Sequence, residues 1–233
     1  MSSGAARGRA DGRDAGPVFL APLRVEEVAI RRGAGGATVE RIGMGPARAT
    51  AARVRLERSL PPGRPVVLLG LAGALAGDLR AGGIVVASTL YSTTATTGAT
   101  ATETVVRSPS AAVPLQPAGE VVALLAEAGL TVRLGPIASS PSIVNGDEDR
   151  RSAAAGGAVA VDMESYWCAP LARLHPFVVV RVVLDVAGRD LWSLPTARGA
   201  SRAYRSLVRS ARALRHWSPV SVSGSPLLEI GDL

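Results

Sequence analysis

The amino-acid sequence predicts one α/β domain in which helices cover both faces of a mixed, mostly parallel twisted sheet, giving three layers. Short runs rich in Val, Ile and Leu alternate with helical patterns along most of the 233 residues. Residues 176–185 form an almost unbroken apolar run, which is typical of a strand buried on both faces. No linker is long enough to separate two domains, so we expect residues 17–217 to fold as one unit.

The first half of the chain predicts alternating strands and helices. The expected elements are a strand at 17–23, a helix that begins beyond Arg24, a strand at 37–43, a helix at 46–58, and strands at 65–71 and 83–88. Pro46 favours the first turn of its helix, where a missing N–H costs nothing. Small residues at 72–74 indicate a turn, and the Thr/Ser/Ala-rich stretch 89–104 indicates a loop or a lid over a ligand.

The second half continues the alternation up to a long last helix. The expected elements are a helix at 118–128, a strand at 131–139, a short helix at 147–155, a strand at 158–161, a second strand at 176–185 after a helical segment, and a helix at 199–217. In the last helix the apolar residues recur at helical spacing and predict its buried face: Tyr204, Leu207, Val208, Ala211 and Leu214.

The two ends of the sequence differ in composition from the domain. Residues 1–16 are rich in Arg, Gly, Ala and Asp and lack the apolar core of a secretory signal, so we expect a disordered leader. Residues 218–233 are interpreted as a flexible tail. Because no apolar run approaches the length of a membrane span, we expect a cytoplasmic protein.

The residue counts exclude several classes of chemistry. The single cysteine, Cys168, excludes an internal disulfide and an iron–sulfur cluster held by several thiolates of this chain. All 26 basic residues are Arg, which excludes a Schiff-base lysine and a P-loop lysine. His175 and His216 have no partner at metal-ligand spacing, so we expect neither a metal site nor a bound cofactor.

The positive charge of the chain has two interpretations. The formal net charge is +7, but only 3% of the residues are aromatic and no base-stacking motif is present, so we expect no nucleic-acid partner. The last helix carries a series of arginines, mostly along one side: Arg202, Arg205, Arg209, Arg212 and Arg215. They form either a solvated face or a surface that contacts anionic lipid at the inner face of the membrane.

Two carboxylates mark the ends of two predicted strands in the last third of the chain. Glu164 follows the apolar run 158–161, and Asp185 closes the run 176–185. Ligands of open α/β sheets bind at the carboxyl ends of parallel strands, so we expect these strands to be parallel neighbours that share a site. The alternative is that Glu164 starts a helix and Asp185 caps a turn.

Three sequence segments, taken together, indicate a protein family more specifically than any one of them does. They are 161–165 (VDMES), 180–185 (VRVVLD), and the Gly-rich segment 70–75 (GLAGAL) with the strand that follows it at 79–86. Their order and spacing resemble the nucleoside phosphorylase and nucleosidase superfamily over roughly residues 18–215. Segments 21–26 (APLRVE) and 43–46 (GMGP) are most similar to the phosphorylases associated with hopanoid biosynthesis.

The resemblance implies cleavage of the N-glycosidic bond of a purine nucleoside, through a transition state like an oxocarbenium ion. It assigns Asp185 as the acid that protonates the leaving purine and Glu164 as the group that binds two ribose hydroxyls. Met163 is expected to pack against the sugar. Further substrate contacts fall on the Gly-rich turn and on the region that stacks on the base: Ala72, Gly73, Ile143 and Val144.

The resemblance leaves the nucleophile open. In the hydrolases a Glu after the first strand orients water, and Glu26 or Glu27 stands there, with Glu26 preferred. In the phosphorylases Arg and backbone N–H groups hold phosphate, which suits Arg24, the turn at Gly43 and, less well, Arg48. We prefer phosphorolysis, with inorganic phosphate as co-substrate and adenosylhopane as the candidate nucleoside.

Two alternatives stay open. One is a hydrolytic nucleosidase of the methylthioadenosine/adenosylhomocysteine type. The other is a nucleoside-binding protein without activity, because Leu71 and Leu184 replace family serines and Gly83 stands where Asp is usual. The resemblance also implies a homo-oligomer, since neighbouring subunits often complete these pockets.

Overall fold

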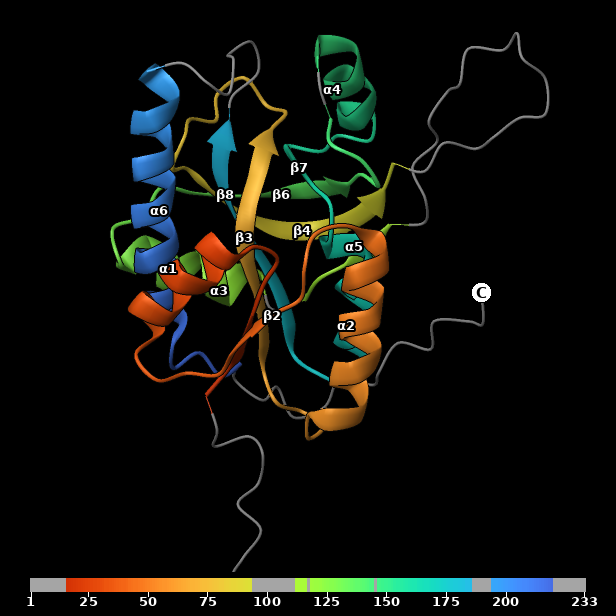
Figure 1. The fold of residues 1–233 in the computed structure, drawn as a ribbon, viewed down its shortest axis with the longest axis vertical. Coiled ribbons are helices and arrows are strands. Elements are labelled where there is room, and N and C mark those ends of the chain that lie inside the picture. The colour runs from red at the N-terminus through yellow and green to blue at the C-terminus, as the bar shows by residue number, and fades with distance from the viewer. Residues whose placement is uncertain (1–15, 94–111, 117, 145, 186–193, 220–233) are drawn as a thin grey trace, which may run out of the picture.

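The computed structural model describes residues 16–93, 112–116, 118–144, 146–185 and 194–219. Within these ranges eight strands form one mixed sheet with helices on two sides (Figure 1), so the predicted fold class is confirmed. Nearly all of the expected leader and tail, and most of the expected loop at 89–104, lie outside the described residues. The domain limits stay predictions.

The strands follow the predicted order, with two extensions and one short strand, β5, that was not predicted. They are β1 (Val18–Ala21), β2 (Val39–Arg41), β3 (Val66–Ala74), β4 (Ile84–Ser92), β5 (Val113–Pro114), β6 (Val132–Ser139), β7 (Ala160–Asp162) and β8 (Phe177–Asp185). The turn predicted at 72–74 is wrong, because these small residues pair with strands on both sides and continue β3. The loop predicted from residue 89 is wrong as far as Ser92, since Leu90 pairs with both β5 and β6.

The pairing closes part of the sheet into a ring. Strand β3 pairs with β8 in parallel and with β7 in antiparallel orientation. Strand β4 pairs antiparallel with β8 and parallel with β6, and β6 pairs parallel with β7, which completes the ring. Strands β1 and β2 extend the sheet outward from β3, both in parallel pairing. The long pair β3–β8 therefore forms the centre on which the other strands are built.

The relation expected between the strands of Glu164 and Asp185 is wrong. Strand β7 runs antiparallel to β3 whereas β8 runs parallel to it, and β7 and β8 do not pair with each other. The two ends nevertheless meet, because Gly73 of β3 is in register with Val161 on one side and with Asp185 on the other. The intervening strand, rather than direct pairing, brings the two segments to one place.

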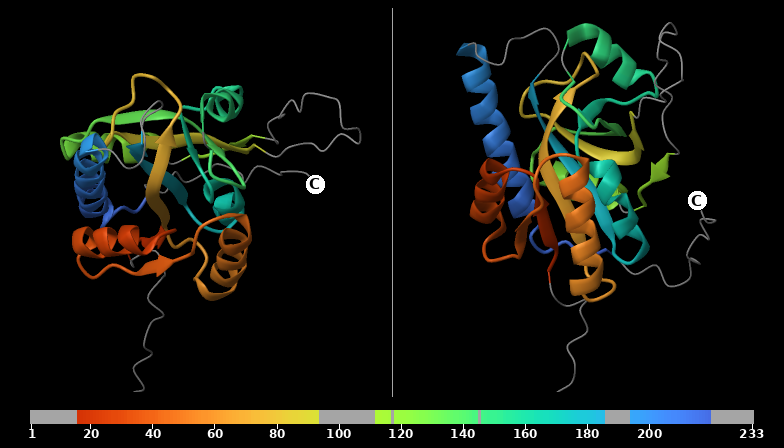
Figure 2. Two further views of the ribbon diagram at one scale, coloured as in Figure 1. Left: turned by 45° about the horizontal axis from the view of Figure 1, so that its top comes forward. Right: turned by 45° about the vertical axis from the view of Figure 1, so that its right-hand side comes forward.

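The helices form two layers around this sheet. They are α1 (Arg24–Ala34), α2 (Pro46–Ser59), α3 (Ala118–Glu127), α4 (Gly146–Ala154), α5 (Ser165–Cys168) with the 3₁₀ helix Ala169–Arg173, and α6 (Leu194–Leu214). Helices α1, α3 and α6 lie on one side of the sheet, and α2 and α5 lie on the other (Figures 1 and 2). Across the described ranges, no helix combines the length and the apolarity that crossing a bilayer requires.

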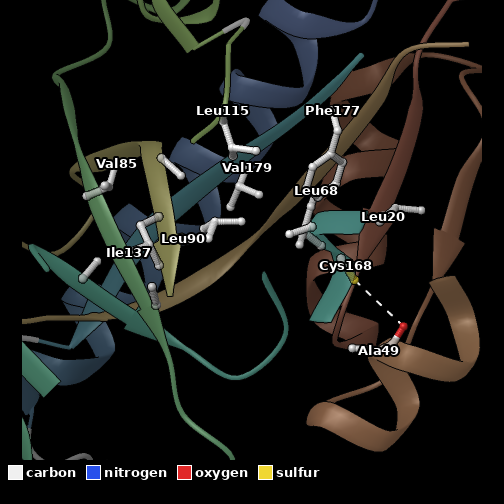
Figure 3. Packing of buried hydrophobic residues seen from close by; sticks show 14 of the residues in the cluster. Leu20, Ala49, Leu68, Val85, Leu90, Leu115, Ile137, Cys168, Phe177 and Val179 are labelled. Atoms are coloured by element: carbon white, nitrogen blue, oxygen red, sulfur yellow. Dashed lines mark hydrogen bonds between the residues drawn. The ribbon is translucent and has the colours of Figure 1, made fainter. Parts of the chain in front are cut away.

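Two apolar cores result from the alternation of side chains along the strands. In β1, Val18 and Leu20 face the core under α2 and α5, whereas Phe19 faces the core under α1, α3 and α6. Figure 3 shows the first of these cores, in which Cys168 is fully buried and its Sγ donates to the carbonyl oxygen of Ala49 at 4.0 Å. Burial raises the pKa of the Cys168 thiol to about 12, so this cysteine serves packing rather than redox chemistry.

Candidate active site

A cavity of about 230 Å³ lies where the ends of β3, β7 and β8 meet the start of α1. It is lined by many of the residues predicted to act: Glu26, Ala72, Gly73, Ile143, Val144, Met163 and Glu164. Leu71 and Leu184, which replace serines of the family pattern, line it as well. The cavity therefore collects side chains from segments far apart in the sequence, as the topology of β3 requires.

Arg181 of β8 stands at the centre of a buried charge cluster beside the cavity. The Nε of Arg181 donates to Oδ2 of Asp162 at 2.7 Å, and its Nη2 donates to Oε2 of Glu164 at 3.3 Å. The Nη2 also donates to Oγ of Ser165 at 3.0 Å. Arg181 is 0% exposed, and burial alone would lower its pKa, but the neighbouring carboxylates together outweigh burial and raise the pKa, so the guanidinium stays charged.

Asp162, the last residue of β7, holds the segment that carries Glu164. Its Oδ1 accepts from Oγ of Ser139 at 2.6 Å and from the backbone N–H groups of Glu164 and Ser165 at 3.2 Å each. Its Oδ2 accepts from Oγ of Ser165 and from Arg181. The carboxylate of Asp162 is thus fully engaged, and we assign it a positioning role.

Glu164 joins the charge cluster to the cavity. Its Oε1 accepts from the backbone N–H of Gly45 at 3.0 Å, while Oε2 faces Arg181. Burial raises the pKa of this carboxyl to about 7, although Arg181 opposes the shift. The side chain therefore titrates near neutral pH and lines the cavity with remaining capacity to accept hydrogen bonds.

Glu26, which also lines the cavity, is fixed by two backbone donors. Its Oε2 accepts from the N–H of Leu23 and its Oε1 accepts from the N–H of Leu71, both at 2.6 Å. Glu26 is 1% exposed, and burial raises its pKa. The hydrogen bond to Leu23 belongs to the capping box of α1, so the helix start positions the carboxylate.

Gly70 allows Glu26 and Arg181 to approach each other. A Cβ atom at Gly70 would lie 2.3 Å from Nη1 of Arg181 and 3.0 Å from Oε1 of Glu26. Within the described part of the chain, this Nη1 is buried and has no hydrogen-bond partner. This nitrogen lies next to a carboxylate that lines the cavity. It can therefore donate a hydrogen bond to a water molecule or to a polar group of a ligand.

The backbone of Asp185 lies at the same end of the sheet as the cavity. It is the last residue of β8 and is in register with Gly73, after a shift of register between Ala72 and Gly73. Gly73 lines the cavity, as does Leu184, which precedes Asp185. The side chain of Asp185 lies outside the part of the chain that is described.

The remaining predicted residues lie outside this cavity. Glu27 pairs with Arg31 on the surface of α1 at 3.0 Å, so the structure distinguishes it from Glu26. Arg24 is the exposed first residue of α1. Arg48 is exposed on α2, and neither it nor Gly43 lines the cavity. The roles of Arg24, Gly43 and Arg48 stay predictions, although Met44 and Gly45 of the same turn reach the cavity and Glu164.

Two features of the candidate site were not predicted. Asp162 was not singled out, although a carboxylate that ends a buried strand must find donors. Arg150 of α4 also lines the cavity, and its Nη1 donates to the carbonyl oxygen of Ala74 at 2.9 Å. Among the described residues, no group of three or more His, Cys, Asp or Glu side chains is arranged to hold a metal ion.

The cluster is electrostatically asymmetric. Three carboxyl groups, those of Glu26, Asp162 and Glu164, surround the guanidinium of Arg181. When all of these groups are ionised, the three carboxylates still outnumber the two guanidinium groups at the cavity, Arg181 and Arg150, so its wall is anionic. Such a wall favours positive charge that develops on a bound molecule and disfavours a bound anion.

Comparisons with solved structures identify the same fold in known enzymes. Futalosine hydrolase of Helicobacter pylori has a TM-score of 0.69 at 16% identity, over 86% of this chain and 97% of that chain. The 5′-methylthioadenosine/S-adenosylhomocysteine nucleosidase of Campylobacter jejuni has a TM-score of 0.68 at 14% identity, over 85% and 98%. The Streptococcus pneumoniae MTA/SAH nucleosidase in complex with 8-aminoadenine has a TM-score of 0.65 at 18% identity, over 85% and 100%.

The fold is thus one that nucleosidases use, and the cavity lies at the end of its central strands. The sequence profile of the phosphorylase superfamily matches residues 22–212, and this chain belongs to that superfamily. No curated protein matches the chain. It is a nucleoside phosphorylase or nucleosidase, an enzyme that cleaves the N-glycosidic bond of a nucleoside.

Proposed function

We propose that this protein hydrolyses the N-glycosidic bond of a purine nucleoside that carries an apolar 5′ substituent. The observation that carries the proposal is the pair of buried carboxyl groups, Glu26 and Glu164, on the wall of one cavity with Arg181 behind them. Membership of the phosphorylase superfamily supports cleavage of a nucleoside. The charge of this cluster is the basis for choosing between water and phosphate as the nucleophile.

The reaction places one proton donor on the base side and one proton acceptor on the sugar side. Asp185 donates a proton to a ring nitrogen of the purine, which leaves with the electron pair of the broken C1′–N bond. A water oxygen forms the new bond to C1′, and its proton passes to Glu26. The products are the free purine and the free sugar, and no other reactant is required.

Glu164 binds the sugar. As a carboxylate it accepts hydrogen bonds from two neighbouring hydroxyls, and its negative charge stabilises the positive charge that develops at C1′. Met163 is adjacent to it on the cavity wall and packs against the ribose. Because the pKa of Glu164 is about 7 in the empty cavity, sugar binding strengthens as the pH rises through neutrality.

The water is held between Glu26 and Arg181. The Nη1 of Arg181 has no hydrogen-bond partner among the described residues, so it is available to donate to a water oxygen. Each oxygen of Glu26 accepts one backbone hydrogen bond, which leaves capacity for a further donor. The raised pKa of Glu26 makes it a better acceptor of the proton from water than an exposed carboxylate.

Charge favours water over phosphate as the nucleophile. A phosphate ion next to Glu26 and Glu164 is repelled by these two groups when they are ionised, and Nε and Nη2 of Arg181 already bond to Asp162 and Glu164. The arginines that were predicted to hold phosphate do not line the cavity, and Arg150, which does, donates to the carbonyl oxygen of Ala74. Phosphorolysis, which we preferred from the sequence, therefore becomes the alternative that the experiment below tests.

The lining of the cavity supports an apolar 5′ substituent. Leu71, Leu184 and Ile143 replace the polar and aromatic groups that are usual in the family, and all three line the cavity. Adenosylhopane, suggested by the resemblance to the hopanoid-associated phosphorylases, is one such nucleoside, and 5′-methylthioadenosine is a shorter one. Both belong in the panel of substrates.

The mouth of the cavity supports a homo-oligomer. Met44 is 41% exposed and Ile143 is 59% exposed at the cavity, so apolar surface remains there for another molecule to cover. We propose that a second copy of the chain covers it. Sedimentation equilibrium of the purified protein tests this, and a monomer at micromolar concentration would contradict it.

Release of free adenine from a panel of adenosine derivatives, with and without phosphate, tests the function. We expect release without phosphate, with 5′-alkyl derivatives preferred over adenosine. Glu26→Gln should lower kcat by about 10²–10⁴-fold because it removes the proton acceptor. Glu27→Gln, on the next residue and outside the cavity, is the matched control and should keep full activity.

Three outcomes would overturn parts of the proposal. Release that depends on phosphate would establish phosphorolysis instead. Tight nucleoside binding without release under either condition would establish a binding protein without activity. Full activity of Asp185→Asn would remove Asp185 as the proton donor.

A further inference from the structure

A second concavity lies on the opposite side of the end of β8, and it shares no lining residue with the active-site cavity. It has a volume of about 820 Å³. Its walls are the turn 78–84 before β4, the turn 129–133 before β6, and one face of α6 from Arg202 to Arg209. We name this concavity the basic groove.

The basic groove gathers arginines from three separate segments. They are Arg80, Arg133, Arg202, Arg205 and Arg209. The acidic residue on its walls is Asp78, which pairs with Arg133 at 2.5 Å. Helix α6 contains no Asp or Glu over its whole length, Leu194–Leu214. The groove therefore carries a large excess of positive charge, which is unfavourable unless an anion binds.

Backbone carbonyl groups hold two of the guanidinium groups in place. Nη1 of Arg80 donates to the carbonyl oxygens of Gly77 at 2.7 Å and of Leu79 at 3.0 Å. Nη2 of Arg209 donates to the carbonyl oxygens of Ala128 at 2.8 Å and of Gly129 at 3.2 Å. These contacts orient the side chains but do not neutralise them, so their charge remains available to a ligand.

Arg202 and Arg205 complete the wall that α6 contributes. Both side chains are exposed, and neither guanidinium group forms a hydrogen bond or an ion pair with a described residue. Positions 202, 205 and 209 recur at helical spacing along one face, over about 10 Å at 1.5 Å per residue. A chain of linked phosphates has a comparable length.

The wall is fixed by contacts between α6 and the turn before β4. Oγ of Ser206 donates to the carbonyl oxygen of Gly82 at 2.7 Å, and the N–H of Gly82 donates to Val183 of β8 at 2.8 Å. Gly82 has φ +87°, and a Cβ there would lie 3.0 Å from Cβ of Arg202, so a glycine is required at this crossing. The groove is therefore built before a ligand arrives.

We propose that the basic groove is a binding site for a small polyphosphorylated molecule, such as a nucleoside triphosphate. Guanidinium groups bind phosphate with paired hydrogen bonds, and several of them converge here from different directions. The volume falls in the range of about 300–1,000 Å³ that is typical of small-molecule sites. A single orthophosphate contacts one or two of the arginines, whereas a triphosphate engages the whole stripe.

Two larger anions fit the groove less well. A bilayer surface is flat, whereas the arginines line a concavity together with Ile84, Leu130 and Val132. Single-stranded nucleic acid is held by stacking on aromatic side chains, and none of the described residues on the walls is aromatic. Arg212 and Arg215, which the sequence grouped with the α6 stripe, do not line the groove.

The proposal goes beyond the hydrolytic function and does not depend on it, because no residue of the groove acts in the reaction. Isothermal titration calorimetry of the purified full chain tests it, with inorganic tripolyphosphate, ATP and orthophosphate as probes. We expect tripolyphosphate and ATP to bind at least about tenfold more tightly than orthophosphate. We expect the affinity to fall steeply with ionic strength.

The test variant is Arg202→Gln with Arg205→Gln, and the matched control is Arg32→Gln with Arg58→Gln. The control removes the same charge from exposed residues near the ends of α1 and α2. We expect the groove variant to lose at least about tenfold in tripolyphosphate affinity, and the control to stay within about twofold. Far-UV circular dichroism checks that both are folded, and Arg205→Gln alone serves as the milder variant.

Three results would overturn the proposal. One is equal affinity of the groove variant, the control and the unmodified protein for tripolyphosphate. Another is absence of tripolyphosphate binding up to about 1 mM, which corresponds to a binding free energy of about −4 kcal/mol. The third is binding of phosphatidylglycerol vesicles or of a single-stranded oligonucleotide without binding of tripolyphosphate, which would assign the groove to a membrane or to nucleic acid.

Discussion

Arginine has opposite roles in the two concavities of this protein. In the active site, the guanidinium of Arg181 is fully buried and is surrounded by three carboxyl groups. In the basic groove, several exposed arginines face one aspartate. The first arrangement gives an anionic wall that favours a cationic transition state, and the second gives a cationic wall that favours an anion. At each site, the burial of the arginine and the number of carboxylates around it determine which charge of ligand is favoured. The residue type alone does not determine it.

The largest effect is expected from Arg181→Met. The substitution leaves Asp162 and Glu164 buried without their common partner, because the guanidinium bridges both carboxylates. We expect the free energy of unfolding at neutral pH to fall by about 3–5 kcal/mol, measured by urea denaturation. A loss below about 1 kcal/mol would mean that the cluster is hydrated, contrary to its burial.

Gly70→Ala tests the close approach of Glu26 and Arg181. The new Cβ would lie 2.3 Å from Nη1 of Arg181, so the locked guanidinium has to move. We expect a loss of about 1–3 kcal/mol in the free energy of unfolding, together with a lower rate of adenine release. Gly77→Ala is the control, since nothing lies within 4 Å of a Cβ there. Equal behaviour of the two variants would contradict the geometry.

Glu164 makes stability depend on pH. Its pKa in the folded protein, about 7, is above its ordinary value of 4.5, so the folded state binds this proton more tightly. The resulting stabilisation is fully present below about pH 4.5 and is lost as the pH rises through about 7. Glu164→Gln removes this dependence. Between pH 5 and pH 8 we expect the unmodified protein to lose about 1–2 kcal/mol relative to the variant. The opposite sign would show that Arg181, not burial, controls this carboxyl.

The smallest effect is expected from Arg205→Gln in the basic groove. The side chain is exposed and has no described partner, so its removal should change the free energy of unfolding by less than about 0.5 kcal/mol. At low ionic strength the variant should be slightly more stable, because repulsion among the groove arginines decreases. A loss comparable to that of Arg181→Met would remove the contrast between the two sites.

The fold was largely predictable because its strands and helices leave local patterns. The apolar run of β8 and the Pro46 start of α2 were read correctly from sequence alone. The local sequence does not indicate which strands pair with one another. The closure of the sheet and the antiparallel course of β7 were therefore not predicted. The small residues at the end of β3 were misread as a turn, because pairing on both sides overrides their local preference.

The residues of the candidate site were predictable where a sequence motif includes them. They were not predictable where their role depends on the charges that surround them in the folded protein. Glu26 and Glu164 were identified through the resemblance and line one cavity. The position of Arg181 between carboxylates of two distant segments, Glu26 on one side and Asp162 with Glu164 on the other, depends on tertiary structure. In the groove, helical spacing identified the α6 arginines, whereas Arg80 and Arg133 join them only in the folded protein.

One measurement tests most directly whether the excess of carboxyl groups around Arg181 makes water, rather than phosphate, the nucleophile. The enzyme is given a 5′-alkyl adenosine derivative in H₂¹⁸O with saturating phosphate, and the sugar product is analysed by mass spectrometry. We predict free sugar that carries ¹⁸O at C1 and no sugar 1-phosphate. Accumulation of the 1-phosphate without ¹⁸O at C1 would contradict the account.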